Sequence, residues 1–294
     1  MEKQSITALM SCFGRAYHAE NERHPVFRDT LAKQLLTEEE YEAIAGYIRG
    51  GAAFFDPALA AQNARPEEVL RRLINGYIAP SPLCRAAWAE RALWGSGAQQ
   101  YVLLGAGLDT FAFRERGVRV FEVDHPLTQA DKKRRIERAD WPAAENLTFV
   151  PADLAADDLA QRLDTAGFAR GERAFFSWLG VTYYLTEEAI GRTLDALAAL
   201  CAPGSLLAFD YPDEGFFTAS ERRVQCTVRM AAAGGEPMRS SFSRAALEEL
   251  LAAHGFRIRE LLTPADIQKN TIDAAGAEMT AFEHVNYCLA ARED

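Results

Sequence analysis

The sequence is poor in the features that mark membrane proteins and nucleic-acid binders. None of its apolar runs approaches the roughly 20 residues that a helix needs to cross a bilayer. Positive charge is also scarce, because 32 Lys and Arg residues stand against 42 Asp and Glu residues, for a formal net charge of −10. A general nucleic-acid binder would need basic patches instead. We therefore expect a soluble cytoplasmic protein with neither a membrane nor a nucleic acid as its partner.

Cysteine and histidine are few and dispersed. The five cysteines form no C-x-x-C pair, and the five histidines form neither an H-x-x-x-H nor an H-x-H spacing. An odd number of widely spaced cysteines is typical of reduced thiols in a core. Without two histidines on one helix face, the sequence predicts no structural or catalytic metal site.

An apolar run that ends in a glycine turn organises the rest of the chain. Residues 101–104 are apolar, and Gly105, Ala106 and Gly107 follow directly. A short apolar run bounded by glycine predicts a strand buried on both faces of a parallel sheet. Glycine lets the backbone turn sharply and approach a ligand closely, and a following helix would point free N–H groups at that ligand. The pattern predicts the first strand of an α/β sheet and a cofactor loop.

The next predicted strand, residues 118–124, ends in Asp124, which lies 19 residues beyond Gly105. A carboxylate at this place can accept hydrogen bonds from both ribose hydroxyls of a cofactor. The dinucleotide fingerprint would also require glycine or alanine at position 110, where the chain has Thr110. A cofactor with a ribose and no pyrophosphate fits better, so S-adenosylmethionine is the leading hypothesis. An NAD-dependent dehydrogenase is the weakest alternative.

Further strands follow at the spacing of an α/β sheet. Residues 147–152 predict a third strand, and Asp153 follows it. In methyltransferase sheets such a carboxylate can accept the exocyclic amine of adenine, while the neighbouring N–H, at Leu154, donates to a ring nitrogen. Alternatively, Asp153 caps a helix over residues 155–163. Residues 174–179 and 205–211 predict strands four and five, and residues 256–262 and 283–291 predict a hairpin-like final pair.

The first 95 residues carry helical patterns and no strand signal. Thr37 and Glu40 fit a capping box, in which each side chain satisfies a backbone donor near the other. Residues 79–82 contain two prolines and predict a break between two helices. We expect a helical cap over residues 1–95, laid on a core of residues 96–294. A dense charge run at residues 131–135 is most typical of a solvated helix face.

Residues 215–241, between strands five and six, depart from the simple alternation of strand and helix. An insertion at this place can form a substrate lid. The alternative is a packed surface helix whose large apolar side chains form its buried stripe. The side chains that would line the lid are Phe216, Phe217, Met230 and Met238.

Four groups of segments carry a resemblance to a known family: residues 104–110; residues 121–126 with Gln129 and Lys132; residues 175–186; and residues 235–242 with 254–256. Together they resemble the leucine carboxyl methyltransferase family, especially its bacterial branch associated with polyketide O-methylation. The resemblance covers about positions 12–290. It implies a class I methyltransferase fold, which is a Rossmann-like seven-stranded sheet with an N-terminal helical cap and a lid between strands five and six. It also implies S-adenosyl-L-methionine as the cofactor.

The resemblance suggests further cofactor contacts. Arg85 stands where the family has an arginine that holds the carboxylate of the methionine moiety, and Arg15 stands near another cationic contact of the family. Many members carry a glutamate where this chain has Leu179, so that contact is absent here or is supplied by backbone. His125 either approaches the adenine or the substrate, or caps a strand end. The expected cofactor residues are Arg15, Arg85, Gly105, Ala106, Gly107, Asp124, His125, Asp153, Leu154 and Leu179.

Methyl transfer from a sulfonium needs placement more than it needs side-chain chemistry. The sequence has no Ser-His-Asp elbow, no Asp-Pro-Pro-Tyr motif of amine methylation and no metal triad. Tyr183 or Tyr184 could hydrogen-bond the acceptor, although both residues also suit packing. We therefore expect an O-methyltransferase that acts by proximity on a carboxylate or hydroxyl of a small molecule such as a secondary metabolite. A protein carboxyl methyltransferase and a non-catalytic S-adenosylmethionine-binding protein stay open, as do the acceptor and the oligomeric state.

Overall fold

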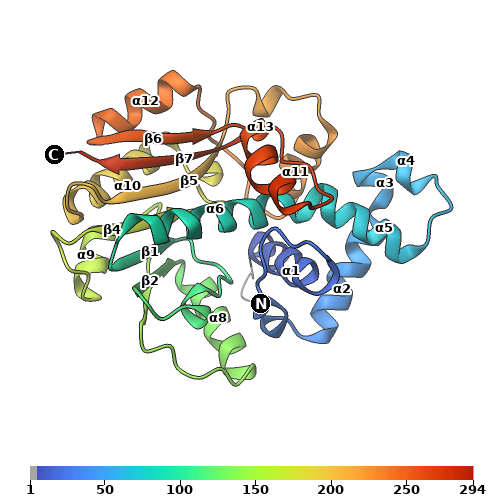
Figure 1. The fold of residues 1–294 in the computed structure, drawn as a ribbon, viewed down its shortest axis with the longest axis horizontal. Coiled ribbons are helices and arrows are strands. Elements are labelled where there is room, and N and C mark those ends of the chain that lie inside the picture. Colours follow the sequence, from blue (N-terminus) through green and yellow to red (C-terminus); the bar gives the residue numbers. More distant parts are fainter. Residues whose placement is uncertain (1–4, 294) are drawn as a thin grey trace.

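The computed structural model describes residues 5–293 and places seven strands in one sheet, in the order β3-β2-β1-β4-β5-β7-β6 (Figure 1). Strands β1 to β5 run parallel, and β7 runs antiparallel to both β5 and β6. This mixed sheet with helices on both faces confirms the predicted fold class. The strands are β1 Gln100–Leu104, β2 Arg119–Asp124, β3 Leu147–Pro151, β4 Ala174–Trp178, β5 Leu206–Pro212, β6 Phe256–Leu262 and β7 Val285–Arg292.

Both faces of the sheet are covered, which explains why its strands read as unbroken apolar runs. Successive side chains of a strand point to opposite faces. Accordingly, Tyr101 and Leu103 of β1 join one buried cluster, whereas Val102 and Leu104 join a second. The first cluster contains the helices that precede β1. The second contains α9 Leu159–Thr165, α10 Glu187–Leu200 and α12 Arg244–Ala253.

The chain before β1 is helical, as predicted. Its capping box at Thr37 and Glu40 is present at the start of α2. The predicted break between two helices falls at Ala79 and is shorter than expected, because Pro80 already starts α6, where proline at the first position loses no helical hydrogen bond. The helices are α1 Ile6–Asn21, η1 Ala32–Leu35, α2 Glu38–Gly50, α3 Ala52–Phe55, α4 Pro57–Ala60, α5 Pro66–Leu73, the π-turn η2 Ile74–Ile78, and α6 Pro80–Ser96.

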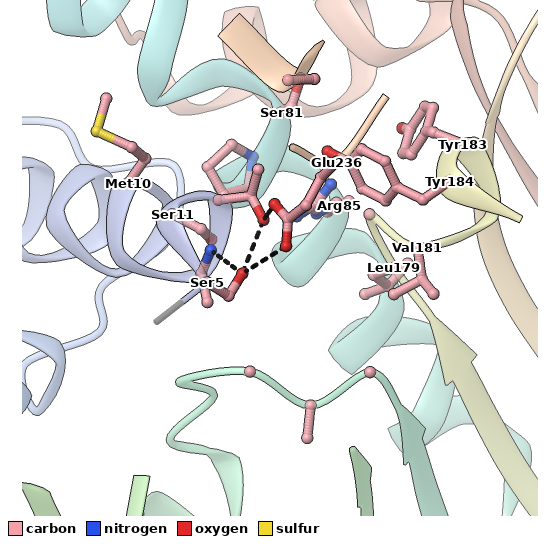
Figure 2. Close-up of a pocket in the computed structure, with 18 of the residues that line it drawn as sticks. Ser5, Met10, Ser11, Ser81, Arg85, Leu179, Val181, Tyr183, Tyr184 and Glu236 are labelled. Atoms are coloured by element: carbon pink, nitrogen blue, oxygen red, sulfur yellow. Dashed lines mark hydrogen bonds between the residues drawn. The ribbon is translucent and has the colours of Figure 1, made fainter. Parts of the chain in front are cut away.

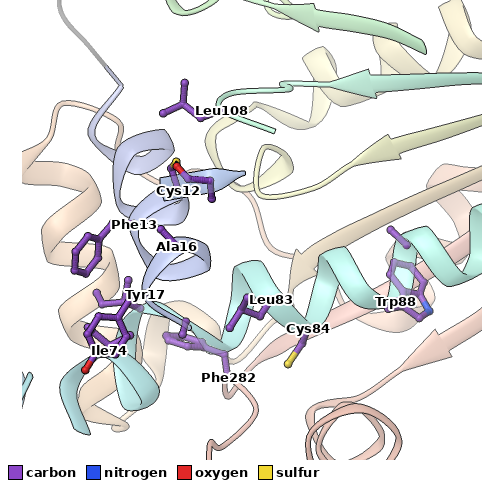
Figure 3. Packing of buried hydrophobic residues seen from close by; sticks show 14 of the residues in the cluster. Cys12, Phe13, Ala16, Tyr17, Ile74, Leu83, Cys84, Trp88, Leu108 and Phe282 are labelled. Atoms are coloured by element: carbon purple, nitrogen blue, oxygen red, sulfur yellow. The ribbon is translucent and has the colours of Figure 1, made fainter. Parts of the chain in front are cut away.

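These helices share a core with the sheet. Figure 3 shows Phe13 and Tyr17 of α1 beside Ile74, and Leu83 and Trp88 along α6. The Trp88 ring lies 5.2 Å from the ring of Tyr287 in β7, measured between centroids, and its Nε1 donates to Glu260 of β6 at 2.9 Å. One hydrophobic cluster therefore contains residues from before and after residue 95. The division of the chain into a cap of residues 1–95 and a core of residues 96–294 stays a prediction.

The prediction of a solvated charge run is wrong for two of its members. They lie on α8 Pro126–Arg138, where Lys132 is 1% exposed and Arg135 is 2% exposed. Lys132 donates to Glu122 of β2 at 2.5 Å, and Arg135 donates to both carboxylate oxygens of Glu40 at 2.7 Å. This helix packs between the sheet and the helices before β1, so two of its faces are buried.

The segment between β5 and β6 contains the short helix η4 Phe216–Thr218 and α11 Arg222–Ala233, followed by a loop to α12. Helix α11 lies against α3, where Nε of Arg222 donates to the carbonyl of Phe55 at 2.7 Å and Nη2 donates to that of Phe54 at 2.6 Å. The two last strands pair as predicted, but α13 Pro264–Ile267 and the π-turn η5 Gln268–Asp273 lie between them. Within residues 5–293, no helix has both the length and the hydrophobicity to cross a membrane.

Candidate active site

A cavity of about 620 Å³ opens where the parallel strands end. Its walls come from the carboxyl ends of β1 to β4, from α1 and α6, and from the segment between β5 and β6. All ten residues predicted to contact the cofactor border this cavity, and so do Tyr183 and Tyr184. The structure therefore brings together residues that are spread over 170 positions, from Arg15 to Tyr184, around one space.

The glycine turn adopts the backbone conformation that favours glycine, with φ of +74° at Gly105 and +51° at Gly107. A Cβ on Gly105 would lie 2.4 Å from Cγ2 of Val181. A Cβ on Gly107 would meet Ala8 of α1 at 3.5 Å, which is ordinary contact. Gly105 is therefore required by the close approach of the loop after β4 as well as by its φ, a reason that the sequence did not reveal.

The helix after the turn is shorter than expected. It is α7 Phe111–Arg114, and its first N–H donates to the Asp109 carboxylate at 2.7 Å. The first of the N–H groups that the sequence predicts to be free is therefore already occupied. Thr110 is fully buried, and its hydroxyl donates to Asp29 at 2.8 Å. The first N–H of α7 is therefore not available to a phosphate.

Asp124 lies at the end of β2, next to the glycine turn, because Val123 pairs with Leu104 in the register of β1 and β2. Its two carboxylate oxygens accept from the backbone N–H groups of Gly107 at 2.5 Å and His125 at 2.7 Å. Burial raises the pKa of Asp124, while these two amides act in the opposite direction. Each oxygen keeps a lone pair for another donor.

Asp153 borders the cavity beside Asp124 and also organises its own turn. Its Oδ1 accepts from the N–H of Ala155 at 2.8 Å. The alternative role as cap of a helix over residues 155–163 is wrong, because α9 begins at Leu159 and Asp158 caps it. His125 is the N-cap of α8, where its Nδ1 accepts from the N–H of Leu127 at 3.3 Å.

The two predicted arginines differ in surroundings. Arg85 of α6 donates to the buried carboxylate of Asp210 at 3.1 Å, and 17% of its side chain remains exposed. Arg15 of α1 pairs with Asp29 and donates to the carbonyl of Leu108 at 2.7 Å. Arg15 therefore holds the glycine loop from the side of α1.

The loop after β4 supplies Leu179 and the short helix η3 Thr182–Tyr184. The hydroxyl of Tyr183 donates to Asp210, so that proton is not free for an acceptor. Burial raises the pKa of Tyr183 well above its usual range and that of Tyr184 to about 12. Neither phenol is therefore a base at neutral pH.

The segment between β5 and β6 forms one wall of the cavity. Figure 2 shows Glu236 facing Ser5 at the start of α1, and its carboxylate accepts from the hydroxyls of Ser5 at 3.3 Å and Thr7 at 2.9 Å. The predicted lid residues Phe216, Met230 and Met238 border the cavity. The prediction is wrong for Phe217, which lies outside the cavity lining and is 44% exposed.

Sequence reasoning missed Asp210 and Glu236. Asp210 could have been found, because it is an acid near the end of an apolar strand, as Asp124 is. No local pattern pointed to Glu236, whose partners lie at the other end of the chain. Among residues 5–293, no three His, Cys, Asp or Glu side chains are grouped so that they could hold a metal ion.

Comparison with known proteins identifies the family. The leucine carboxyl methyltransferase family model matches residues 8–198. The chain belongs to this family. It is also 38% identical to YktD of Bacillus subtilis (strain 168) over 99% of both chains, and YktD carries the provisional name of an S-adenosyl-L-methionine-dependent methyltransferase. A relative from Frankia alni with a similar provisional name is 40% identical over 70% of this chain and 68% of its own length.

Two solved structures resemble this family member in fold. One is a DUF574 family protein from Streptomyces avermitilis, with a TM-score of 0.57, 16% identity and coverage of 99% and 98% of the two chains. The other, from Thermobifida fusca YX, is provisionally named a methyltransferase and has a TM-score of 0.57 at 14% identity, with coverage of 100% and 97%. Family membership removes the NAD-dependent dehydrogenase from the alternatives.

Proposed function

We propose that this protein, an S-adenosylmethionine-dependent methyltransferase by its family, methylates an oxygen atom of a small molecule. The acceptor oxygen belongs to a carboxylate or a hydroxyl. The observation that carries the proposal is that one cavity of about 620 Å³ joins the predicted cofactor residues to apolar side chains of the segment 215–241. When bound, the cofactor supplies the electrophilic methyl group.

The residues at the strand ends fit the chemistry of this cofactor. Asp124 offers acceptor lone pairs to ribose hydroxyls, and Asp153 lies next to it where adenine would continue. Arg85 lies across β1 from them, on the side of β4 and β5. A volume of about 620 Å³ falls within the range of pockets that bind cofactors and drug-sized ligands.

The contacts and the lining of the lid segment support a small acceptor over a protein. Glu236 is held by two hydroxyls of α1, and the N–H of Arg239 donates to the carbonyl of Tyr183 at 2.6 Å. A protein carboxyl methyltransferase would need a groove wide enough for a peptide. Phe216, Met230 and Met238 instead give the lid side an apolar lining, which suits a small organic molecule.

The surroundings of the two tyrosines bear on the acceptor group. Neither Tyr183 nor Tyr184 can take a proton from the acceptor at neutral pH. An ionised carboxylate needs no base, whereas a phenol with a pKa near 10 gains from one. Both kinds of acceptor stay within the proposal, and the experiment separates them.

The test is transfer of label from [methyl-³H]S-adenosylmethionine in the presence of a panel of aryl and aliphatic carboxylic acids and phenols, and separately of cell protein. Label in a small molecule supports the proposal; release by mild alkali identifies a methyl ester, and resistance identifies an ether. Alkali-labile label in protein would establish the protein carboxyl methyltransferase instead. Binding of S-adenosylhomocysteine without any turnover would favour the non-catalytic alternative.

Calorimetric titration of S-adenosylhomocysteine tests the cofactor end of the cavity. We expect Asp124→Ala to weaken binding at least about tenfold, because hydrogen bonds to a charged group contribute roughly 1.5–3 kcal/mol. Asp164→Ala is the matched control, since Asp164 forms a surface ion pair with Arg170 and does not border the cavity. Equal affinities for the wild type and Asp124→Ala would contradict this placement.

A further inference from the structure

Asp210 lies at the centre of a buried polar cluster near the end of β5. Its side chain is fully buried, and three donors from different elements converge on it. The N–H of Gly180 donates to Oδ1 at 2.6 Å, Nη1 of Arg85 donates to Oδ2 at 3.1 Å, and the hydroxyl of Tyr183 donates to Oδ2 as well. One carboxylate thus ties β5 to α6 and to the loop after β4.

Only a carboxylate satisfies this arrangement. Gly180, Arg85 and Tyr183 all present donors, and an ionised carboxylate offers acceptors alone. An asparagine in the place of Asp210 would turn its NH₂ group either toward Gly180 or toward the other two donors. Each orientation leaves a donor facing a donor in a buried site, which is costly.

The cluster fixes the position of Arg85. Among residues 5–293, Asp210 is the single protein partner that the Arg85 side chain hydrogen-bonds. Gly180 has a φ of +72°, and a Cβ there would lie 2.4 Å from both terminal nitrogens of Arg85. The guanidinium is therefore confined between a glycine without a side chain and a buried charge. Four of its five N–H groups remain for a ligand in the cavity that it borders.

The sheet order places this cluster opposite the adenosine end of the proposed site. Strands β2 and β3, which carry Asp124 and precede Asp153, lie on one side of β1, whereas β4 and β5 lie on the other. A ligand whose ribose lies at Asp124 would extend its amino-acid end toward β4 and β5. The proposed function thus puts a carboxylate of the ligand near Arg85.

Resting on that function, we propose that Asp210 is a positioning residue, which orients Arg85 for the α-carboxylate of the methyl donor. Asp210 does not touch the ligand. It acts by presenting a guanidinium that is already ordered, so that little side-chain entropy is lost when the carboxylate binds. A planar guanidinium in a fixed orientation can donate two parallel hydrogen bonds to a carboxylate.

Two ligands separate this role from a general structural one. S-Adenosylhomocysteine carries the amino-acid moiety, and 5′-methylthioadenosine shares its adenosine but lacks that moiety. We expect Asp210→Asn to weaken S-adenosylhomocysteine about 10- to 100-fold, the range for a lost hydrogen bond between charged groups. We expect methylthioadenosine to change less than about threefold, since it has no carboxylate for Arg85 to bind.

A second variant keeps the proposal testable if Asp210→Asn does not fold. Gly180→Ala leaves Asp210 in place and introduces the methyl group that would displace Arg85. It should produce the same selective loss. Gly204→Ala is the matched control, because Gly204 also has a positive φ, +81°, and does not border the cavity.

Each binding result decides between the role of Asp210 and its alternatives. Selective loss of S-adenosylhomocysteine binding supports the role of Asp210. Equal weakening of both ligands, or of neither, overturns it and leaves the proposed function standing. Failure of the wild type to bind S-adenosylhomocysteine would overturn the proposed function together with this inference.

Discussion

The buried pair of Glu122 and Lys132 makes a prediction about stability that depends on pH. Each side chain is 1% exposed, and Nζ lies 2.5 Å from Oε2 of the carboxylate. The second oxygen, Oε1, has no hydrogen-bond partner among residues 5–293. Burial raises the pKa of Glu122 from 4.5 to about 7, although Lys132 acts in the opposite direction. Replacing Lys132 with methionine removes the cation and keeps most of the volume.

The sign of the effect follows from proton linkage. A carboxyl whose pKa is raised by folding binds more protons in the folded than in the unfolded state, so it lowers the free energy of unfolding as pH rises. In the wild type this loss falls between pH 4.5 and about 7. Without Lys132 the folded pKa rises further, and the loss continues at higher pH, at about 1.4 kcal/mol for each unit.

The expected cost of Lys132→Met therefore grows with pH. Near pH 5.5 the Glu122 carboxyl holds its proton in the folded variant, and the cost is mainly one hydrogen bond, about 1 kcal/mol. At pH 8 the folded variant still holds that proton, whereas the wild type stops losing stability above about pH 7, so the cost rises by up to about 1.4 kcal/mol, to about 2–2.5 kcal/mol. Urea unfolding followed by tryptophan fluorescence at the two pH values measures the difference.

Two further variants test whether the cost comes from the buried charge. Glu122→Gln combined with Lys132→Met should recover much of the stability at pH 8, because no charge remains to be buried. Lys269→Met, at an exposed position, should stay within about 0.5 kcal/mol of the wild type at both pH values. A cost of Lys132→Met that is the same at pH 5.5 and pH 8 would refute the argument.

Three other changes have expected outcomes. Gly105→Ala should lower stability by about 1–3 kcal/mol in thermal unfolding through its contact with Val181, and Val181→Ala in the same chain should restore part of this; no recovery would contradict the contact. Thr110→Val should cost about 1–3 kcal/mol in urea unfolding because buried Asp29 loses a donor, whereas Thr110→Ser should be tolerated. Glu236→Gln should release S-adenosylhomocysteine about three- to tenfold faster in stopped-flow experiments, and an unchanged rate would show that the hydrogen bonds of Glu236 to Ser5 and Thr7 do not limit release.

The strands could be predicted from sequence because their physics is local. Each is a short apolar run between turn residues, and β1 to β7 lie within about two residues of the predicted positions. Acids at the ends of β2 and β3 followed from the same pattern, since parallel strands end at one edge of the sheet. This rule would also have selected Asp210 in β5.

The contacts that fix the site were beyond local reasoning. Asp210 and Arg85 are 125 positions apart, and Glu236 and Ser5 are 231 positions apart. The error at Lys132 has the same origin, because a charged helix reads as solvated until its neighbours are known. Gly105 is a different case, because the residue was selected correctly but only part of its role was recognised. Its requirement for glycine also depends on Val181, which lies far away in the sequence.

The sequence argued against a pyrophosphate from Thr110 alone, whereas the structure provides a stronger reason. Thr110 does not border the cavity; its hydroxyl is bonded to Asp29, so its side chain is no direct obstacle to a ligand. The charges around the cavity are decisive instead. Arg15 and Arg85 are each paired with a buried aspartate, which offsets their positive charge. Five acids therefore face three arginines, Arg15, Arg85 and Arg239, around the cavity, a balance that disfavours a pyrophosphate and favours a sulfonium cation. The acids that border the cavity are Glu90, Asp109, Asp124, Asp153 and Glu236.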